Sequence, residues 1–292
     1  MARPFHYKKR EYHHKAFSID YALLFLILLG IVVVQSVGAC ARSENKSAGG
    51  EETEIFVSKH DMLDSVVMIC MPKPLENTTE QILKRASYVV SYNSETHQPN
   101  WVAWKLTAEH TDGIYGRINT FFEDEEIPVP RATLNDYRGS GWSRGHMCPA
   151  GDNKWDKKAM YDTFLLTNVC PQNANLNSGV WNRIEMDCRK WAKKYGSIYI
   201  ICGPIFFKSQ EHERIGPNRI PVPEAFFKVI LCLEGTPKGI GFICRNTDGN
   251  RKKDFYVNSI RQVERITGYQ FFPNLEDSVK SQIYDMDDIT IW

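Results

Sequence analysis

The chain has 292 residues, of which 42% are apolar and 24% are charged. This is an ordinary globular composition, ample for one sizeable core and short for two full domains. Its formal net charge is only +1, which excludes a strong global positive field, so any contact with nucleic acid would need a local basic cluster.

The N-terminal segment carries an uncharged, largely apolar run from Tyr21 to Ala41, preceded by basic residues. About 20 such residues suffice to cross a bilayer, so residues 1–40 are predicted to be a signal peptide or membrane anchor. The run ends in Val-Gly-Ala-Cys40, which resembles the lipobox of bacterial lipoproteins. We therefore predict a bacterial lipoprotein lipidated at Cys40, with an uncleaved transmembrane anchor or a secreted protein as alternatives. Both anchors would hold the folded domain outside the cytosol.

The charge balance changes after this segment. Five of the 36 basic residues and two of the 35 acidic residues lie in positions 1–40, which leaves 31 basic and 33 acidic residues. Residues 41–60 begin with a stretch rich in Ser, Gly, Glu and Lys, which cannot bury enough apolar surface to order itself and is predicted to be a flexible tether. Residues 61–292 are predicted to form the main domain, although residues 55–85 show no assignable pattern.

The main domain shows strand patterns and helix patterns in alternation. Residues 87–92 and 100–107 are predicted to form a hairpin. Buried strands are predicted at residues 164–169, 197–207, 225–233 and 239–245, the last two as antiparallel neighbours. A helix is predicted from the spacing of apolar residues between Trp181 and Trp191, ending at Gly196, and another near Ile260 to Ile266, closed by Gly268. The chain is therefore expected to be α+β with one core.

Seven cysteines follow Cys40, and the odd number argues against a complete disulfide framework. No Cys-x-x-Cys pair of the kind that structural zinc sites use is present. A disulfide between Cys148 and Cys170 is left open, because these residues flank the motifs described next. A zinc or thiol site built from Cys148, Cys170 and Cys188 is poorly supported by their spacing.

The motif Ser-Arg-Gly-His-Met-Cys-Pro-Ala at residues 143–150 begins the chemically informative region. A neutral imidazole such as that of His146 can take a proton from water near neutral pH. Asn177 and Glu185 offer oxygen ligands suited to a hard cation that keeps most of its water. The guanidinium groups of Arg117 and Arg144 can neutralise charge on a phosphate in the transition state. Together these residues supply what phosphodiester hydrolysis needs.

This pattern resembles the DNA/RNA non-specific endonuclease family of the ββα-metal superfamily, over about residues 91–275. Several separate matches occur in the same order: Ser91-Tyr92-Asn93 with Trp101-Val102-Ala103, the Asn, Pro-Gln, Asn, Trp and Glu within residues 168–185, residues 220–229, and Ile266-Thr267-Gly268. The resemblance implies a ββα-metal (His-Me finger) nuclease fold, with a central, mainly antiparallel sheet flanked by helices.

The resemblance also implies roles for single residues. His146 corresponds to the general base that activates water, and Asn177 to the one direct protein ligand of a Mg²⁺ ion. Glu185 corresponds to a carboxylate that acts on the metal through water, and Asn168 to a supporting residue nearby. If Asn177 opens the helix, Glu185 lies about two turns along and roughly 80° round, so a water bridge is natural.

The family's phosphate-contacting arginines correspond to Arg117, Arg144 and Arg189. The implied activity is hydrolysis of DNA and RNA, single- or double-stranded, without sequence preference, because contacts to backbone phosphates carry no base information. The implied products carry 5′-phosphates. Mg²⁺ is the expected cofactor, with Mn²⁺ or another divalent cation as alternatives, and a homodimer is left open.

Each assignment has a structural alternative. His146 could be a structural histidine, Asn177 a helix cap and Glu185 a solvated helix residue. Arg189 could be an ordinary surface cation near a helix end. Trp181 is interpreted as core packing rather than as a platform on which a base stacks.

Position 143 departs from the family motif, which usually begins with Asp. Ser143 keeps the capacity for hydrogen bonds but lacks the charge, so we expect reduced or retuned activity rather than none. This departure and the slightly acidic main domain motivate a second hypothesis: a catalytically weak or inactive surface lipoprotein that binds nucleic acid or a protein partner.

Overall fold

The computed structural model describes residues 59–207, 211–247 and 251–292. The predicted anchor at residues 1–40, the lipidation at Cys40 and nearly all of the predicted tether lie outside the described residues. Within the described ranges, no helix has the length and apolar character that a membrane crossing requires.

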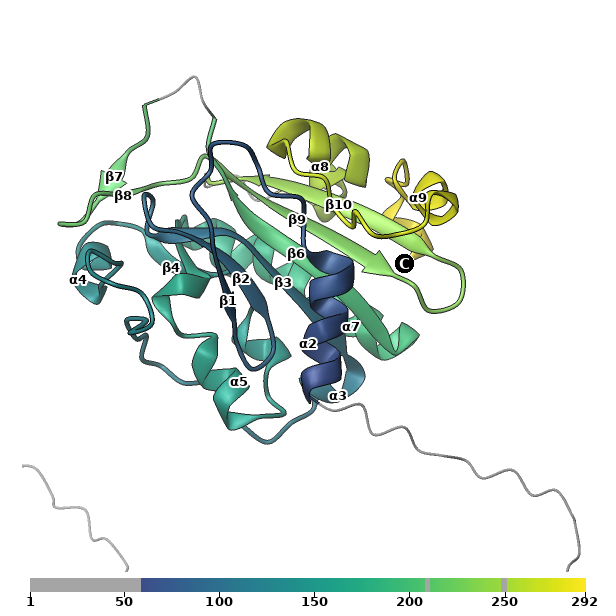
Figure 1. The fold of residues 1–292 in the computed structure, drawn as a ribbon, viewed down its shortest axis with the longest axis horizontal. Helices are drawn as coiled ribbons and strands as arrows, with labels where there is room; N and C mark the ends of the chain where they lie inside the picture. The colour runs from purple at the N-terminus through teal and green to yellow at the C-terminus, as the bar shows by residue number, and fades with distance from the viewer. Residues whose placement is uncertain (1–58, 208–210, 248–250) are drawn as a thin grey trace, which may run out of the picture. The chain divides into compact units, whose positions relative to one another are not determined.

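A seven-stranded sheet forms the centre of this part of the chain (Figure 1). Its order is β1-β2-β3-β6-β9-β10-β11, and every neighbouring pair is antiparallel. The strands are β1 (Gln81–Lys84), β2 (Val89–Asn93), β3 (Gln98–Thr107), β6 (Ser197–Ile205), β9 (Ala225–Cys232), β10 (Lys238–Arg245) and β11 (Val257–Asn258). Strands β6 and β9 are buried along their whole length because both faces of the sheet are covered.

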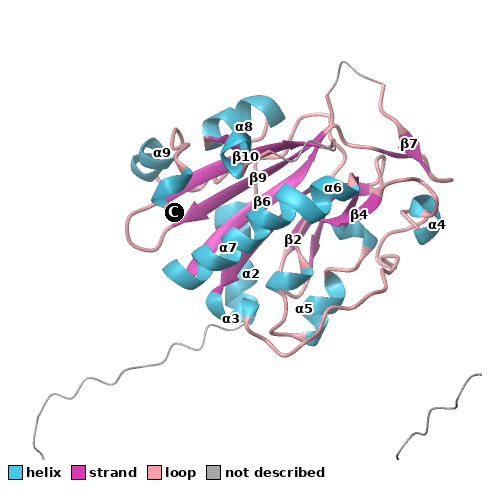
Figure 2. Cartoon of the chain, turned by 180° about the vertical axis from the view of Figure 1, so that it is seen from behind, coloured by secondary structure: helices cyan, strands magenta, loops and turns pink. Residues whose placement is uncertain are grey.

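Helices pack on both faces of this sheet. Successive residues of a strand point to opposite faces, so Ile200 of β6 packs with the core on the side of α7 (Asn182–Tyr195), while Ile201 packs with the core on the other side. That other side is covered by α2 (Lys59–Cys70), α8 (Ile260–Thr267) and α9 (Asp277–Ile283). Figure 2, seen from behind, shows α7 lying across the sheet.

Most of the predicted elements are confirmed. The predicted hairpin is formed by β2 and β3, and the strands predicted at residues 197–207, 225–233 and 239–245 are β6, β9 and β10. The last two pair antiparallel, as predicted. The two predicted helices are α7 and α8, and each ends at a glycine with positive φ, Gly196 at 93° and Gly268 at 82°.

The strand predicted at residues 164–169 is wrong. This segment forms the 3₁₀ helix η2 (Leu166–Asn168), and a strand, β5 (Val169–Gln172), begins only at its last residue. The Asn168 N–H bonds to the Leu165 carbonyl at 2.9 Å, which closes a turn. A short apolar run marks burial without distinguishing a strand from a turn of helix, and burial was the part predicted correctly.

The residues that resisted assignment also form regular structure. They contain α2, which packs on the sheet through Val66 and Cys70, and the edge strand β1. Short elements fill the connections: α3 (Ala108–Thr111), α4 (Leu134–Tyr137), η1 (Ala150–Asp152), α5 (Lys157–Asp162), β7 (Arg214–Ile215), β8 (Ile220–Pro221), η4 (Lys253–Tyr256) and η5 (Ile289–Ile291).

A β-ribbon followed by a helix lies on the α7 side of the sheet. Strand β4 (Ser143–His146) pairs antiparallel with β5, and the chain continues through α6 (Ala174–Leu176) and η3 (Asn177–Trp181) into α7. Met147, Cys170 and Val180 join this ribbon and helix to the core on that face of the sheet. The motifs singled out in the sequence therefore gather in one ββα unit.

All seven cysteines among the described residues are free and buried. The disulfide left open between Cys148 and Cys170 is not formed. Cys170 pairs with Gly145 in the ribbon, whereas Cys148 lies beyond the last paired residue of β4, and its Sγ accepts a hydrogen bond from Asn153 Nδ2 at 3.4 Å.

Candidate active site

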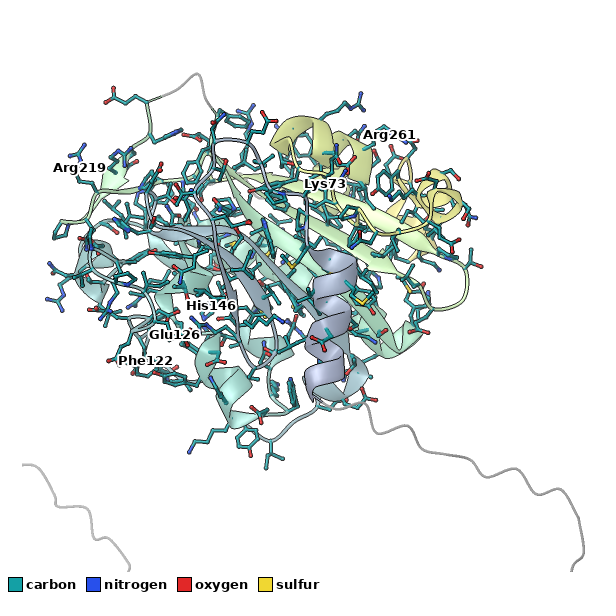
Figure 3. The ribbon with its side chains drawn as sticks, in the orientation of Figure 1. Lys73, Phe122, Glu126, His146, Arg219 and Arg261 are labelled. Carbon is teal, nitrogen blue, oxygen red and sulfur yellow. The ribbon has the colours of Figure 1, made fainter. Side chains whose placement is uncertain are left out.

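Strand β4 ends at His146, which Figure 3 labels. The preceding glycine is required by the ribbon itself, because a Cβ at Gly145 would lie 2.3 Å from Oε1 and 2.6 Å from Cβ of Gln172 on β5. No larger side chain can stand there without moving β5. The glycine of the Arg-Gly-His sequence thus follows from the close pairing of β4 and β5.

Asn168 fixes the backbone immediately after His146. Its Nδ2 donates to the carbonyls of Cys148 (2.8 Å) and Thr163 (2.9 Å), and its Oδ1 accepts from the Cys148 N–H (2.9 Å). Its own carbonyl accepts from the Met147 N–H at 2.9 Å. The side chain is fully buried, so the support it gives runs through the backbone.

Two phenylalanines hold the imidazole and its neighbouring arginines in one cluster. The His146 ring lies 5.0 Å from the Phe121 ring and 4.9 Å from the Phe164 ring, centroid to centroid. Arg144 lies over Phe121 at 4.7 Å, and Arg117 lies over Phe164 at 5.4 Å. Each aromatic ring therefore contacts both the imidazole and one guanidinium group.

The charge state of His146 follows from this setting. Burial, followed by the positive charges of Arg117 and Arg144, lowers its pKa to about 3. The imidazole is therefore neutral at physiological pH. Its Nε2 is buried without a hydrogen-bond partner among the described residues.

Arg117 and Arg144 are exposed, and neither forms an ion pair within the described chain. Two guanidinium groups without carboxylate partners, next to a neutral imidazole, make a local positive centre in a chain of nearly balanced charge. This is the local basic cluster that the composition required of a phosphate-binding protein.

Asn177 does not open α7 as the sequence suggested. It begins the π-helical turn η3, and Gly179, with φ −97° and ψ −113°, kinks the chain before α7 starts at Asn182. The angle expected between Asn177 and Glu185 on one straight helix is therefore wrong. The local helix cap is Asn173, whose Oδ1 accepts the N–H groups of Asn175 and Leu176.

The Asn177 side chain is partly exposed and makes no hydrogen bond among the described residues. The cap alternative for this residue is thereby removed, since a cap would accept a backbone N–H. Helical irregularities of the π type are frequent at functional sites.

Glu185 is partly buried on α7 and accepts no hydrogen bond within the described chain. Burial raises its pKa to about 7, against the opposing effect of the Lys228 cation, and Asp152 raises it further. Arg117 also acts on this carboxyl, as it does on His146. Glu185 is thus not an ordinary solvated helix residue, and Arg117 links it electrostatically to the imidazole.

Lys228, which the sequence analysis missed, is a fully buried cation at the centre of the sheet. Its Nζ lies 4.4 Å from the Trp181 ring and 5.1 Å from the Trp104 ring. Burial lowers its pKa, but Cys202 and Glu185 raise it more, so the net shift is upward and the amine is charged. The available signal was that Lys228 is the one charged residue in the apolar run 225–233.

Arg189 forms an ion pair with the buried Asp152 carboxylate at 2.8 Å, and Asp152 also accepts from Trp104 Nε1 at 3.2 Å. The alternative that Arg189 is an ordinary surface cation is therefore wrong. Trp181 is 1% exposed and packs against Phe226, which confirms its prediction as core.

The donors fit a hydrated divalent cation better than a preformed cage. No group of three or more His, Cys, Asp or Glu side chains that could hold a metal occurs in the described ranges, so the zinc or thiol hypothesis gains no support. Asn177 and Glu185 offer oxygen atoms that accept no hydrogen bond from any described residue. A hard cation that keeps its waters needs no more than this.

An antiparallel ribbon whose first strand ends at His146 and which leads into α7 defines a ββα fold. A crystal structure of an EndoG/EndoGI complex shares this fold, with a TM-score of 0.64 and 29% sequence identity over 68% of this chain and 88% of that chain. The predicted α+β fold class is confirmed.

The chain belongs to the DNA/RNA non-specific endonuclease family, whose model matches residues 69–278. It is 33% identical to the mitochondrial nuclease EXOG of Mus musculus over 86% of this chain and 73% of that protein. It is 36% identical to the mitochondrial endonuclease G of Bos taurus over 67% of this chain and 70% of that protein. The protein is therefore a nuclease, a hydrolase with nucleic acid as its substrate.

Proposed function

We propose that this nuclease cleaves phosphodiester bonds within DNA and RNA, without sequence preference, in a reaction that depends on a divalent cation and leaves 5′-phosphate ends. The observation that carries the proposal is the His146 cluster: a buried neutral imidazole, two aromatic rings, and two arginines that form no ion pair with the described residues. The unpaired oxygens of Asn177 and Glu185 support the dependence on a cation.

His146 is the general base. Its imidazole takes a proton from a water molecule, the water oxygen forms a bond to phosphorus, and the bond between phosphorus and the 3′ oxygen breaks. The leaving oxygen then takes a proton from solvent. Because the pKa of His146 lies at about 3, the base is available at every physiological pH, at the cost of a weaker affinity for the proton.

Arg117 and Arg144 bind the scissile phosphate and offset the charge that grows on its oxygens. Their stacking on Phe164 and Phe121 fixes both groups before substrate arrives, so little is lost in ordering them. Asn168 keeps the end of β4 in register, and Arg189 with Asp152 supports α7 beneath Glu185; a phosphate contact by Arg189 would use donors outside that ion pair.

Asn177 would bind the cation directly and Glu185 would hold it through water. When bound, Mg²⁺ would stabilise the negative charge on the leaving 3′ oxygen. Mn²⁺ has the same preference for oxygen ligands and is the alternative. All of these contacts involve phosphate and water rather than base edges, which supports cleavage without sequence preference.

Degradation of plasmid DNA and of structured RNA by the full-length protein tests the proposal. We expect cleavage in Mg²⁺, none in EDTA, and a loss of at least about a thousandfold in His146→Ala, whereas Arg265→Ala on α8 serves as a surface control. Products should accept a label from polynucleotide kinase only after phosphatase treatment. Wild-type protein that binds DNA without any product, or His146→Ala with wild-type activity, would instead favour the non-catalytic hypothesis.

The location and assembly of the protein remain proposals. An anchor lipidated at Cys40 is one candidate, and the mitochondrial names of the mouse and bovine relatives introduce a mitochondrial targeting segment within residues 1–40 as the other. Cell fractionation of the wild type and of Cys40→Ser separates them, because only a lipidated protein leaves the membrane fraction on substitution. Gel filtration of the purified protein tests whether it forms a homodimer.

A further inference from the structure

A surface outside the His146 cluster has the chemistry of a nucleic-acid contact. It consists of Arg245 at the end of β10, Arg251, and Phe255 in η4, and we call it the β10–η4 surface. These residues line a cavity of about 470 Å³ together with Ile243, Thr247 and Tyr256. No motif match in the sequence pointed to it.

Phe255 is 62% exposed, which is unusual for a large aromatic side chain outside a binding surface. The Arg251 guanidinium lies 4.3 Å from the centre of its ring. Arg245 and Arg251 are both exposed, and no ion pair neutralises either of them in the described part of the chain. Arginines beside an exposed aromatic ring suit a strand whose phosphates need cations and whose bases stack.

The β10–η4 surface is braced against the ββα unit. Arg183, in the first turn of α7, donates to the Arg251 carbonyl at 3.3 Å. Lys253 forms an ion pair with Asp187, also on α7. Because Glu185 lies between these two α7 residues in sequence, the surface adjoins the helix that carries the proposed cation site.

A second link joins the other end of this surface to the ribbon. Asn246, next to Arg245, accepts from the Asn173 N–H at 2.8 Å and donates to the Pro171 carbonyl of β5 at 3.1 Å. Asn173 caps α6, the turn that leads to Asn177. The β10–η4 surface is thus held in a fixed position beside the ribbon and α7.

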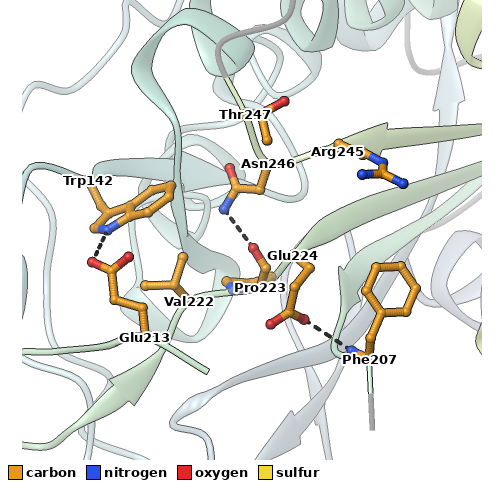
Figure 4. Close-up of a pocket in the computed structure, with 9 residues that line it drawn as sticks. All are labelled: Trp142, Phe207, Glu213, Val222, Pro223, Glu224, Arg245, Asn246 and Thr247. Atoms are coloured by element: carbon orange, nitrogen blue, oxygen red, sulfur yellow. Dashed lines mark hydrogen bonds between the residues drawn. The ribbon is translucent and has the colours of Figure 1, made fainter. Parts of the chain in front are cut away.

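A neighbouring cavity, drawn in Figure 4, is lined by acidic residues and is therefore unfavourable for a phosphate chain. It has a volume of about 340 Å³ and shares Arg245 and Thr247 with the first cavity, but Glu213 and Glu224 line it. These carboxylates bond to Trp142 Nε1 and to the Phe207 N–H, and they repel phosphate. Arg245 points away from them in Figure 4. A polyanion therefore favours the side of Arg251 and Phe255.

We propose that the β10–η4 surface binds the nucleic-acid strand beyond the scissile phosphate, with Arg245 and Arg251 on backbone phosphates and Phe255 stacked on a base. The inference rests on the proposed function, since it assigns a further part of the same substrate. It makes the enzyme prefer long strands over short ones without reading their sequence.

The test compares Arg251→Ala/Phe255→Ala with a matched control, Arg265→Ala/Ile266→Ala, which removes an exposed arginine and an exposed apolar residue from α8 on the other side of the sheet. Binding of a fluorescent single strand of about 30 nucleotides to the full-length protein is measured in EDTA, and binding of one of about 4 nucleotides beside it. We expect the long strand to bind about tenfold to hundredfold more weakly to the first variant. The control and the short strand should change less than about twofold.

Arg245→Ala should weaken binding of the long strand. It should also reduce the slope of log K against log salt concentration by about one released counterion. Hydrolysis of a small chromogenic phosphodiester in Mg²⁺ should be unchanged in all of these variants, because the His146 cluster is intact. Equal binding of the long strand by the two double variants would overturn the inference, as would binding of anionic vesicles that the first variant alone loses while it keeps the nucleic acid. Absence of hydrolysis in the wild type would count against the proposed function and leave this comparison readable.

Discussion

Replacement of Asn168 by alanine should destabilise the protein strongly and should do so through the backbone that follows His146. The substitution removes three hydrogen bonds of 2.8–2.9 Å from a side chain that is fully buried. It leaves the carbonyls of Cys148 and Thr163 and the N–H of Cys148 without partners. A buried polar group without a partner costs about 1–3 kcal/mol, and water entering the vacated space recovers part of it, so we expect a loss of about 3–5 kcal/mol.

Urea unfolding followed by tryptophan fluorescence measures this loss, with Asn119→Ala at an exposed position as the control. The slope of the transition should stay the same, because the folded state buries the same surface. Asn168→Asp should not rescue stability, since it sets an oxygen against two carbonyl oxygens. The concentration of Mg²⁺ that half-saturates activity should change little. Stability within about 1 kcal/mol of wild type, or a raised Mg²⁺ requirement alone, would refute a role through the backbone.

Three further outcomes are expected. In metal-free protein, lowering the pH from about 6.5 to 5 should reduce the free energy of unfolding by about 2 kcal/mol in the wild type but not in His146→Gln. The reason is that the imidazole binds a proton in the unfolded chain over this range, whereas burial holds its pKa in the folded protein at about 3. Urea unfolding at several pH values that shows the same dependence on pH in both proteins would contradict this. Lys228→Met should raise the pKa of Glu185 beyond about 7 and shift the rise of nuclease activity to higher pH, and it should destabilise the fold because it removes one member of a buried, charged cluster; an unmoved pH profile would refute that coupling. Ser143→Asp should increase the phosphodiesterase rate by restoring the family's carboxylate, and no gain, or a loss, would count against our account of the departure at position 143.

The periodic parts of the fold were predictable because burial on both faces of the sheet leaves long apolar runs in β6 and β9. Helix α7 was predictable because one face is buried and the other is charged. The segment at residues 164–169 failed because its hydrogen bonds, including that from the Phe122 N–H to the Phe164 carbonyl at 3.0 Å, depend on a partner more than 40 residues away in sequence. Local patterns carry no information on such a partner.

In the candidate site, too, some features could be predicted from local sequence and others depend on distant partners. His146, Asn177 and Glu185 could be named from their motif and its resemblance, and their roles stay predictions. Phe121 could not, since nothing in its sequence neighbourhood shows that it stacks on both His146 and Arg144. The kink at Gly179 was also missed, because a single glycine before a helix is compatible with either a straight start or a break.

The free thiols have a practical consequence for the chemistry of the fold. Burial raises the pKa of Cys148 and Cys170 well above its ordinary range, so both stay protonated and react slowly. The core among the described residues holds no disulfide, and its assembly therefore requires neither an oxidant nor a disulfide isomerase. Dithiothreitol should leave its melting temperature where it is.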